Sequence, residues 1–418
     1  MRFLYSTRER HPAIRVDLAQ LFSNGLATKG HCVDWHMQAM AHGPTRVEKM
    51  GLRERVFVGR AFGNGGAWLK LLNQLSALRH DLRLIRFIRC GRYDFIQVRD
   101  KAFAAMVGLL AARRKGLPFY YWMSFPYAEA DSLRARDRTL GFSMAERLFY
   151  FIRGALIGWL LYRVLLRRAD HIFVQSDRMK KDVAERGVLL EKMTVVPMGV
   201  NLEQVKNADH IKSDDPCIVG RLPLVYMGTL VRVRRIDFLV EMLPRVLKHF
   251  PDALLVLVGD APERDLCLLR DAVERLRVGD SVIFMGFVPI ERAWAYVRSA
   301  RVCLSPFRPS RILDSCSPTK VVEYMAWGRP VVANRHPDQS KVLEESGAGL
   351  AVAYEPKAFA DAVIELLYDH GRAEAMGARG VDYVRKHRSY RALSANLERQ
   401  YLKLLGIRRE AMPTESCQ

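Results

Sequence analysis

The 418-residue sequence predicts an α/β protein with two Rossmann-like domains that face each other across a cleft. Three observations predict this fold class. The C-terminal half alternates short apolar runs with amphipathic helical patterns, as doubly wound parallel sheets do. The N-terminal half repeats this rhythm less regularly. A polar stretch (201–216) separates the halves, and a chain of this length has room for two or three ordinary domains.

The strands are predicted from nearly continuous apolar runs, most of which end at Gly, Pro or Ser, as buried parallel strands do. In the N-terminal half these runs are 2–7, 55–60, 95–100, 118–124, 171–176 and 193–199. In the C-terminal half they are 222–228, 253–259, 281–286, 301–307, 329–334 and 349–354. Helical patterns occupy 237–250, 263–277 and about 392–405.

These elements divide the chain into four parts. They are an N-terminal, acceptor-side domain (1–200), a linker (201–216), a C-terminal, donor-binding domain (217–385), and a C-terminal helix with a tail (386–418). We expect the last part to pack back toward the N-terminal domain. Ligands of open parallel sheets bind beyond the carboxyl ends of the strands, so the loops that follow the strands are where chemistry is expected.

Composition excludes several classes of protein. Half of the residues are hydrophobic, which rules out a wholly disordered chain. The seven cysteines are scattered and contain no C-x-x-C pair, which disfavours a zinc ribbon or an oxidised scaffold. The N-terminal residues lack the apolar core of a signal peptide, and no uncharged apolar run is long enough to span a bilayer. We therefore expect a cytoplasmic protein.

The positive charge is concentrated in the N-terminal half. Residues 1–200 carry 34 Lys and Arg against 17 Asp and Glu, a net charge of +17, whereas the rest of the chain carries +4. A charged partner is therefore expected to meet the N-terminal half, and anionic lipid and nucleic acid are the two candidates.

Residues 146–168 form a long apolar helical pattern with arginines on one side. Such a helix can lie in a membrane interface, with its arginines at the lipid phosphates. It can equally be a core helix of the first domain. The interfacial alternative implies a protein held peripherally on the inner face of the cytoplasmic membrane.

The segment 314–332 (DSCSPTKVVEYMAWGRPVV) predicts a short helix that begins beside the carboxyl end of a strand. Ser317 is suited to the N-cap position, Pro318 to the first helical position, and Gly328 to the C-terminal end. The exposed amides of the first turn, together with Lys320, are typical of an anion-binding site.

Glu323 lies one turn further along this helix. A carboxylate there can accept hydrogen bonds from two ribose hydroxyls while the amides hold a phosphate. An ordinary capped helix with a solvated Glu323 is the alternative.

A second polar loop follows the strand that ends at Gly228. It contains Arg232, Arg234 and Arg235, whose guanidinium groups repel one another unless an anion such as a diphosphate lies among them. A solvated basic surface is the alternative.

Four sequences carry a resemblance to a known family. GTLVRVRRID, LLVLVGDAP, FMGFVPIERAWAYVRSARVCLSPF and SPTKVVEYMAWGRPVVAN follow in order between residues 217 and 385. Together they resemble the donor domain of family-4 retaining glycosyltransferases of the GT-B fold. The N-terminal half is similar more diffusely, through RFLYST, ATKGHCVDW, HIFVQSDRMKKDVAERG and VVPMGVN.

The resemblance implies catalytic roles for two residues. Arg234 takes the place of the lysine that binds the donor pyrophosphate in the family, and Glu323 matches the second Glu of the E-x7-E signature, which binds the donor ribose. Ser315 stands where the first Glu is expected. Arg232 or Arg235 replaces the family arginine, because Thr229 occupies its position.

The resemblance also implies the remaining donor-binding residues. The nucleobase wall corresponds to Gly286, Phe287 and Val288. The phosphate-binding strand end and helix start correspond to Gly228, Ser317, Pro318, Thr319 and Lys320. In the N-terminal domain the family's glycine pair and histidine are replaced, which leaves His11 and Ser124 as candidates.

The expected reaction transfers a sugar from a nucleotide-sugar to a lipid-linked or glycan acceptor, with retention at the anomeric carbon. No Asp-x-Asp pair or HExxH motif occurs, so we expect no metal and no cofactor besides the nucleotide-sugar co-substrate.

Two other classes are considered: a nucleotide-sugar 2-epimerase of the same fold, and a non-enzymatic basic protein that binds membrane or nucleic acid. The donor motifs favour the transferase and argue against a nucleic-acid partner. The sequence does not specify the base, the sugar or the acceptor.

Overall fold

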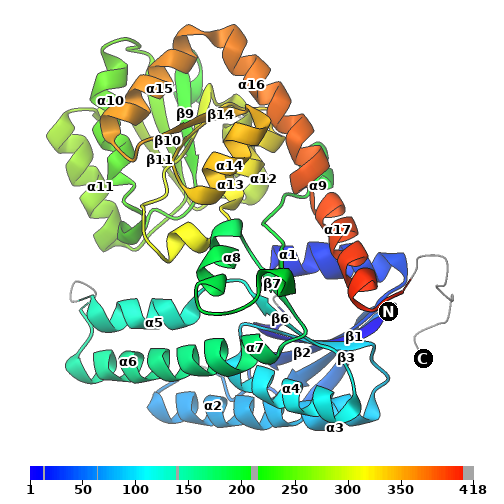
Figure 1. The fold of residues 1–418 in the computed structure, drawn as a ribbon. Coiled ribbons are helices and arrows are strands. Elements are labelled where there is room, and N and C mark those ends of the chain that lie inside the picture. Colours follow the sequence, from blue (N-terminus) through cyan, green and yellow to red (C-terminus); the bar gives the residue numbers. More distant parts are fainter. Residues whose placement is uncertain (13–14, 64, 138–140, 209–214, 408–418) are drawn as a thin grey trace. The chain divides into compact units, whose positions relative to one another are not determined.

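The computed structural model describes residues 1–12, 15–63, 65–137, 141–208 and 215–407. The chain forms two compact units (Figure 1). Unit 1 contains Met1–Pro197 and the C-terminal segment that begins at Leu393, and unit 2 contains Met198–Ala392. Residues 209–214 of the predicted linker and 408–418 of the predicted tail lie outside the described residues.

Unit 2 contains a six-stranded parallel sheet in the order β11-β10-β9-β12-β13-β14. Its strands are β9 (Leu222–Met227), β10 (Ala253–Val258), β11 (Val282–Gly286), β12 (Val302–Ser305), β13 (Val331–Asn334) and β14 (Gly349–Val352). Its helices are α9 (Leu202–Asn207), α10 (Asp237–Leu247), α11 (Glu263–Leu276), α12 (Ile290–Ser299), α13 (Thr319–Ala326), α14 (Pro337–Ser346), α15 (Pro356–Tyr368) and α16 (His370–Tyr383).

Helices cover both faces of this sheet, which explains why its strands are continuously apolar. Leu224 and Tyr226 of β9 belong to one core, whereas Val225 and Met227 belong to the core on the other face. A strand buried on both sides needs apolar residues at every position. The six runs predicted in the C-terminal half are therefore the six strands of this sheet.

Unit 1 contains an eight-stranded sheet in the order β3-β4-β2-β1-β5-β6-β7-β8, parallel except for the edge strand β3. Its strands are β1 (Arg2–His11), β2 (Cys32–Ala39), β3 (Arg46–Gly51), β4 (Glu54–Gly59), β5 (Phe95–Arg99), β6 (Phe119–Met123), β7 (His171–Val174) and β8 (Met193–Val195). Its helices include α1 (Val16–Leu18), α2 (Ala67–Leu82), α3 (Leu84–Cys90), α4 (Ala102–Lys115), α5 (Tyr127–Arg136), α6 (Met144–Trp159), α7 (Leu166–Arg168) and α8 (Asp177–Ala184).

The six predicted N-terminal strands are present, but β2 and β3 were not predicted. In β2, Asp34 and His36 interrupt the apolar run, although both are buried. The Asp34 carboxylate accepts hydrogen bonds from Arg55 (Nη2–Oδ2, 2.6 Å) and Tyr93 (2.8 Å), and the His36 ring pairs with Ser6 (2.9 Å). Partners on other elements thus satisfy polar groups that the local sequence leaves unexplained.

The last helix, α17 (Tyr390–Leu404), packs on unit 1 after the chain leaves unit 2. Tyr401 is fully buried, donates a hydrogen bond to Gln97 (2.7 Å) and stacks on Phe95 (4.8 Å between centroids). Glu398 pairs with Lys29 (2.9 Å) and with the buried His31 (3.0 Å).

The apolar pattern at 146–168 lies in a continuous helix, Met144–Arg168, formed by α6, a π-helical turn (Leu160–Leu165) and α7. Its most apolar 18-residue window is only 22% buried, so the core-helix alternative is wrong for most of the helix. It holds at the C-terminal end, where Leu161, Tyr162, Leu165 and Leu166 belong to the core of unit 1. By length and composition this helix could cross a membrane. Its buried side packs on α5, where Arg153 forms a bidentate pair with Asp131 (2.6 and 2.7 Å).

Candidate active site

The carboxyl ends of β9, β10 and β11 are closed by three glycines whose φ angles are positive: Gly228 (147°), Gly259 (143°) and Gly286 (65°). A Cβ on Gly259 would lie 2.0 Å from the carbonyl oxygen of Gly228, so any side chain there is excluded. The backbone is therefore bare at the edge of the sheet where parallel α/β folds bind ligands.

Lys320 crosses directly over Gly228. A Cβ on Gly228 would lie 2.4 Å from Cε of Lys320, and the ammonium lies 5.4 Å from the centroid of the Tyr226 ring. Burial lowers the pKa of Lys320 to about 8; the nearby charge of Arg234 lowers it as well, and Glu323 opposes the shift. The glycine is thus needed to let the half-buried Lys320 reach the sheet edge.

Arg234 places a second cation at this position. Its guanidinium lies 5.0 Å from the centroid of the Phe307 ring, and its buried Nη1 has no hydrogen-bond partner among the residues that the structure describes. A guanidinium that donates no bond and a lysine with a lowered pKa indicate a site made for an anion.

Glu323 follows Lys320 by one turn of α13. Burial raises the pKa of its carboxyl, while the charge of Lys320 acts in the opposite direction. The helix is fixed to the sheet by Tyr324, whose hydroxyl oxygen accepts a hydrogen bond from the amide of Met227 (2.8 Å). A carboxylate and a lysine are therefore held side by side next to the end of β9.

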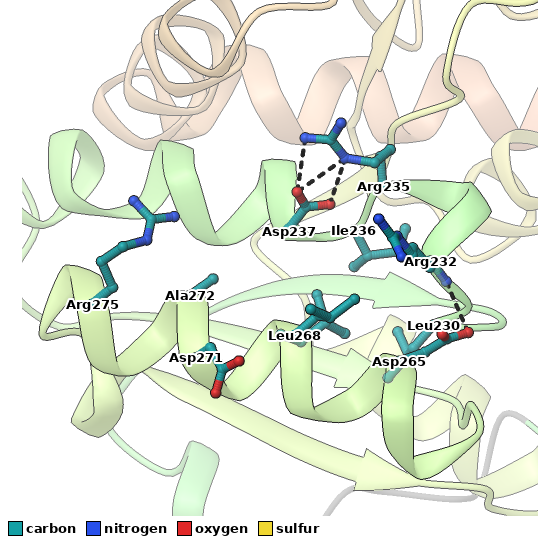
Figure 2. A pocket seen from close by; sticks show the side chains of 11 residues that line it. Leu230, Arg232, Arg235, Ile236, Asp237, Asp265, Leu268, Asp271, Ala272 and Arg275 are labelled. Carbon is teal, nitrogen blue, oxygen red and sulfur yellow. Dashed lines mark hydrogen bonds and ion pairs between the residues drawn. The ribbon is translucent and has the colours of Figure 1, made fainter. Parts of the chain in front are cut away.

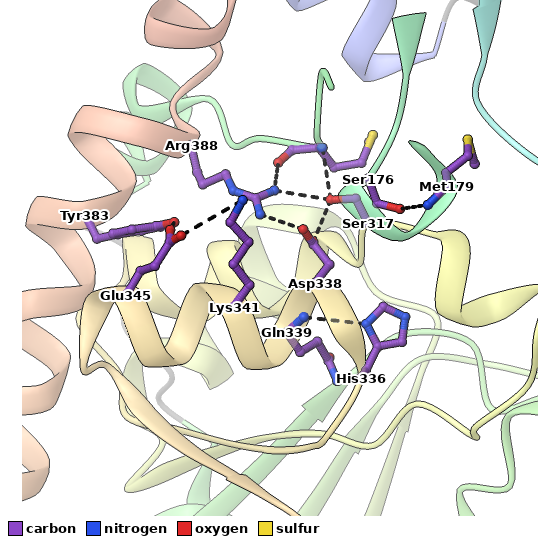
Figure 3. Close-up of polar contacts among 11 residues, drawn as sticks. Ser176, Met179, Ser317, His336, Asp338, Gln339, Lys341, Glu345, Tyr383 and Arg388 are labelled. Carbon is purple, nitrogen blue, oxygen red and sulfur yellow. Dashed lines mark hydrogen bonds and ion pairs between the residues drawn. The ribbon is translucent and has the colours of Figure 1, made fainter. Parts of the chain in front are cut away.

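Ser317 does not cap α13 as predicted. The helix begins at Thr319, and Pro318 occupies the N-cap position. The Ser317 hydroxyl donates to Asp338 (2.8 Å) and accepts from the amide of Met198 (3.1 Å), while Arg388 binds both Ser317 (3.2 Å) and Asp338 (2.7 Å; Figure 3). Ser317 therefore fixes the chain before α13 and leaves the first helical amides open.

Arg232 and Arg235 are not brought to Lys320 and Arg234. They line a separate pocket of about 330 Å³ between the start of α10 and α11 (Figure 2). The Arg235 guanidinium is paired with Asp237 (2.9 Å), and the Arg232 amide donates to Asp265 (3.1 Å). Of the three predicted loop arginines, Arg234 alone lies beside Lys320.

The predicted base-binding and signature residues occupy different surroundings. Phe287, beside Gly286 at the end of β11, is 85% exposed and can stack on a planar ring, and Val288 is half-buried. Ser315 is buried, and its hydroxyl donates to the carbonyl of Arg311 (3.4 Å).

The candidates in unit 1 each have a partner of their own. His11 is buried and pairs with Glu48 of β3 (2.7 Å). Ser124 follows β6, and both its amide (3.0 Å) and its hydroxyl donate to Asp100, which follows β5 at φ 56°. Burial raises the pKa of Asp100. Ser124 thus stands at the carboxyl edge of the sheet, in a polar cluster.

Three further residues were not predicted. The Phe307 ring lies against Arg234, and the Tyr226 ring lies against Lys320. The sequence signal that could have found them is an aromatic residue at or near the end of a strand. In unit 1, Arg99 is fully buried against Asp17 (2.8 Å), and no local pattern indicates this pair. Within the described ranges, no group of three or more His, Cys, Asp or Glu residues could hold a metal ion.

Two family models match the two halves of the chain. Residues 221–369 match the model described as glycosyl transferases group 1, and residues 19–199 match the glycosyl transferase 4-like domain. The chain belongs to the GT-B glycosyltransferases. Its motifs therefore belong to a transferase and not to an epimerase or a non-enzymatic basic protein.

Curated relatives of this glycosyltransferase agree with the family. A GDP-mannose-dependent alpha-(1-6)-phosphatidylinositol monomannoside mannosyltransferase of Mycobacterium tuberculosis is 28% identical over 278 residues, which cover 63% of this chain and 71% of that protein. An alpha-monoglucosyldiacylglycerol synthase of Streptococcus pneumoniae is 23% identical, covering 66% of this chain and 59% of that protein.

Solved structures share the fold of the glycosyltransferase. Sucrose-phosphate synthase from Thermosynechococcus elongatus aligns with a TM-score of 0.69 at 18% identity, over 97% of this chain and 99% of that one. Anabaena HepE in complex with UDP aligns with a TM-score of 0.63 at 16% identity, over 96% of this chain and 100% of that one.

The lowered pKa of Lys320 predicts a pH dependence of diphosphate binding. The protonated lysine attracts the anion, and a free-state pKa of about 8 means that the proton is lost as the pH rises from 7 to 9.5. If binding requires this proton, affinity for a nucleoside diphosphate falls by at most roughly 30-fold over this range. Calorimetric titration measures the decline. Lys320→Met should bind weakly and independently of pH, and an equal decline in that variant would contradict the assignment.

Proposed function

We propose that this glycosyltransferase moves a hexose from a nucleotide-sugar to a lipid-linked or glycan acceptor in the synthesis of a cell-surface glycolipid or polysaccharide. The observation that carries the proposal is the meeting of Arg234, with an unpartnered buried Nη1, and Lys320, with a lowered pKa, at the carboxyl end of β9. The names of the relatives support a lipid acceptor, because one is a mannosyltransferase named for phosphatidylinositol monomannoside and the other is a synthase of the glycolipid monoglucosyldiacylglycerol.

The donor is expected to lie along the carboxyl edge of unit 2. The nucleobase stacks beside Phe287, the ribose hydroxyls bind Glu323, and the diphosphate lies between Arg234 and Lys320. As the bond between the sugar and the diphosphate breaks, negative charge grows on the leaving phosphate, and the two fixed cations stabilise it. The family resemblance supports same-face attack, in which a donor phosphate oxygen takes the proton of the acceptor hydroxyl. We propose that these cations, without a metal ion, balance the diphosphate.

The donor can be identified by thermal stabilisation with UDP-, GDP- and ADP-sugars. A ligand at 100 times its Kd stabilises a folded protein by about 2.7 kcal/mol, which is readily measured. The nucleotide-sugar that stabilises the protein is then incubated with it and a bacterial lipid extract. Transfer of labelled sugar to lipid supports the proposal, whereas no stabilisation by any nucleotide-sugar would overturn it.

Arg234→Ala is expected to weaken nucleoside diphosphate binding by roughly 1.5–3 kcal/mol, about ten- to a hundredfold, because a charge-assisted contact is lost. Arg232→Ala is the matched control: it removes the same side chain two residues away, from the separate pocket of Figure 2. Titration of both variants, with circular dichroism to verify folding, should show a large loss for the first and a small one for the second. Equal losses would contradict the site.

Glu323→Gln and Ser315→Ala should separate in the same assay. The first keeps the shape but removes the charge that holds the ribose hydroxyls, so it should lose roughly 1.5–3 kcal/mol of donor binding. The Ser315 hydroxyl is committed to a backbone carbonyl, so its removal should cost roughly 1 kcal/mol or less. A loss as large in Ser315→Ala would show that the signature is aligned wrongly. The next residue to test would then be Asp314, the carboxylate that directly precedes Ser315.

We also propose that the protein is cytoplasmic and binds the inner face of the cytoplasmic membrane through unit 1. One row of large apolar residues on α6 is between 53% and 76% exposed: Met144, Leu148, Phe149, Phe151, Ile152, Leu156 and Trp159. A second exposed row occupies α2: Trp68, Leu71, Leu75, Leu78 and Leu82. Apolar helix faces on a strongly basic half of a protein are typical of attachment to an anionic bilayer surface.

This attachment predicts co-sedimentation with vesicles of phosphatidylglycerol but not with vesicles of phosphatidylcholine, because the basic charge selects an anionic surface. Binding should weaken as the salt concentration rises from 0.05 to 0.5 M, over which the screening length shortens severalfold. Equal binding to both vesicles, or to neither, would contradict an electrostatic attachment.

A further inference from the structure

Unit 1 has a pocket of about 560 Å³ at the C-terminal end of the helix Met144–Arg168. Trp159, Tyr162, Arg163 and Arg167 of the helix line one side, and Glu185 and Arg186, which follow α8, line the other. The donor site of unit 2 does not account for this pocket, and the sequence pattern at 146–168 indicates arginines on the helix but no pocket.

The pocket carries an excess of positive charge. Arg186 is engaged, because it pairs with Glu129 (2.7 Å) and stacks on Tyr162 (4.2 Å from the centroid). The guanidinium groups of Arg163 and Arg167 form no ion pair or hydrogen bond within the described part of the chain, although both are exposed. Glu185 is the one acidic side chain that lines the pocket. An anion would therefore find two uncommitted arginines there.

The pocket continues the exposed face of the helix. Ile152, Leu156 and Trp159 lie on that face, and Arg163 and Arg167 follow Trp159 at steps of four residues. The same side of one helix thus changes from apolar to aromatic to basic. This order matches the order of acyl chains, interface and phosphates in a lipid monolayer.

The pocket is distinct from the edge of unit 1 where the acceptor is expected. α8 starts just after the carboxyl end of β7 and runs back, so the residues after it lie toward the amino ends of the strands. α7 leads directly into the amino end of β7. Ser124 and Asp100, in contrast, follow the carboxyl ends of β6 and β5.

We propose that this pocket binds the phosphate of an anionic phospholipid whose acyl chains lie along the exposed row of α6, and that this lipid anchors the enzyme and is not its sugar acceptor. The proposal rests on the membrane attachment proposed above. It adds a defined headgroup site to a general attraction between a basic surface and an anionic bilayer.

The test compares the intact protein with Arg163→Gln/Arg167→Gln in binding to phosphatidylglycerol vesicles. Each arginine near the surface contributes about fivefold to the affinity, so the double variant should bind roughly 25-fold more weakly. The control, Arg264→Gln/Arg277→Gln, removes two exposed arginines from α11 and its C-terminal end in unit 2, and should bind less than threefold more weakly. Nucleoside diphosphate affinity should be unchanged in both.

The outcomes separate this proposal from the attachment itself. If the intact protein binds no vesicles, the attachment fails. If it binds vesicles and the two double variants lose affinity equally, the attachment stands and the pocket proposal is overturned. Inorganic phosphate binding that the arginine substitutions abolish, without weaker vesicle binding, would indicate a free phosphate ligand and also overturn it.

Two further measurements exclude other occupants. Mass spectrometry of phosphatidylglycerol recovered after incubation with enzyme and donor should find no added sugar; a glycosylated lipid would make the pocket an acceptor site. Light scattering without lipid should show a monomer. A dimer that Leu148→Ser/Ile152→Ser dissociates would mean that a second copy covers the face, which would overturn the proposal.

Discussion

The buried ion pair between Arg388 and Asp338 is the constraint on which the donor side of the molecule depends. Arg388 lies at the end of a π-helical turn after α16, and both side chains are less than 10% exposed. Burying two charges costs desolvation energy, which is offset only when their remaining atoms are hydrogen-bonded. Here the pair also binds Ser317 and the carbonyl of Met198 (3.3 Å), so few polar atoms are left unsatisfied. The start of α13 is thereby fixed by residues far away in the sequence.

Fixing α13 explains the unusual electrostatics beside it. Lys320 and Glu323 are carried on a helix whose start is held by Ser317 and whose middle is held by Tyr324 on β9. Both side chains are half-buried at this position, and burial lowers the pKa of Lys320 and raises that of Glu323. Arg234 adds a further positive charge. These charges are therefore in place before a ligand binds. Fixed cations accelerate a reaction by stabilising the negative charge that develops on the leaving group.

The sequence predicts the strands of both sheets well because a strand buried on both faces must be apolar at every position. It fails at β2, where Asp34 and His36 are satisfied by Arg55, Tyr93 and Ser6 from other strands and loops. The donor site is predictable in part for the same reason. Lys320 and Glu323 are predicted from the local pattern of their helix, whereas the pattern of the basic loop does not show which of Arg232, Arg234 and Arg235 binds the anion.

Tertiary contacts decide which arginine enters the site and what Ser317 does. Asp237 holds Arg235 in an ion pair, and Phe307, more than 70 residues away, lies against Arg234. Ser317 has the residue type of an N-cap, but Asp338 and Arg388 take its hydroxyl. The pattern of one segment contains no information about side-chain partners that are distant in sequence.

The helix Met144–Arg168 shows another limit of prediction from sequence. Its helical pattern is clear, but the pattern does not show which side of the helix faces the protein. A helical wheel gathers the charged residues within one arc of a mostly apolar circumference, and the ordinary expectation places most of the apolar residues inside the protein. Arg153 instead points inward, paired with Asp131, and Gly154 lets α5 approach so closely that a Cβ would lie 3.1 Å from the carbonyl of Ala128. This partly buried ion pair holds the Arg153 position of the helix against α5, and the row of large apolar residues of α6 faces outward. The anionic bilayer surface proposed above suits this exposed row, and it also suits Arg163 and Arg167 at the end of the row, which form no ion pair with any described residue.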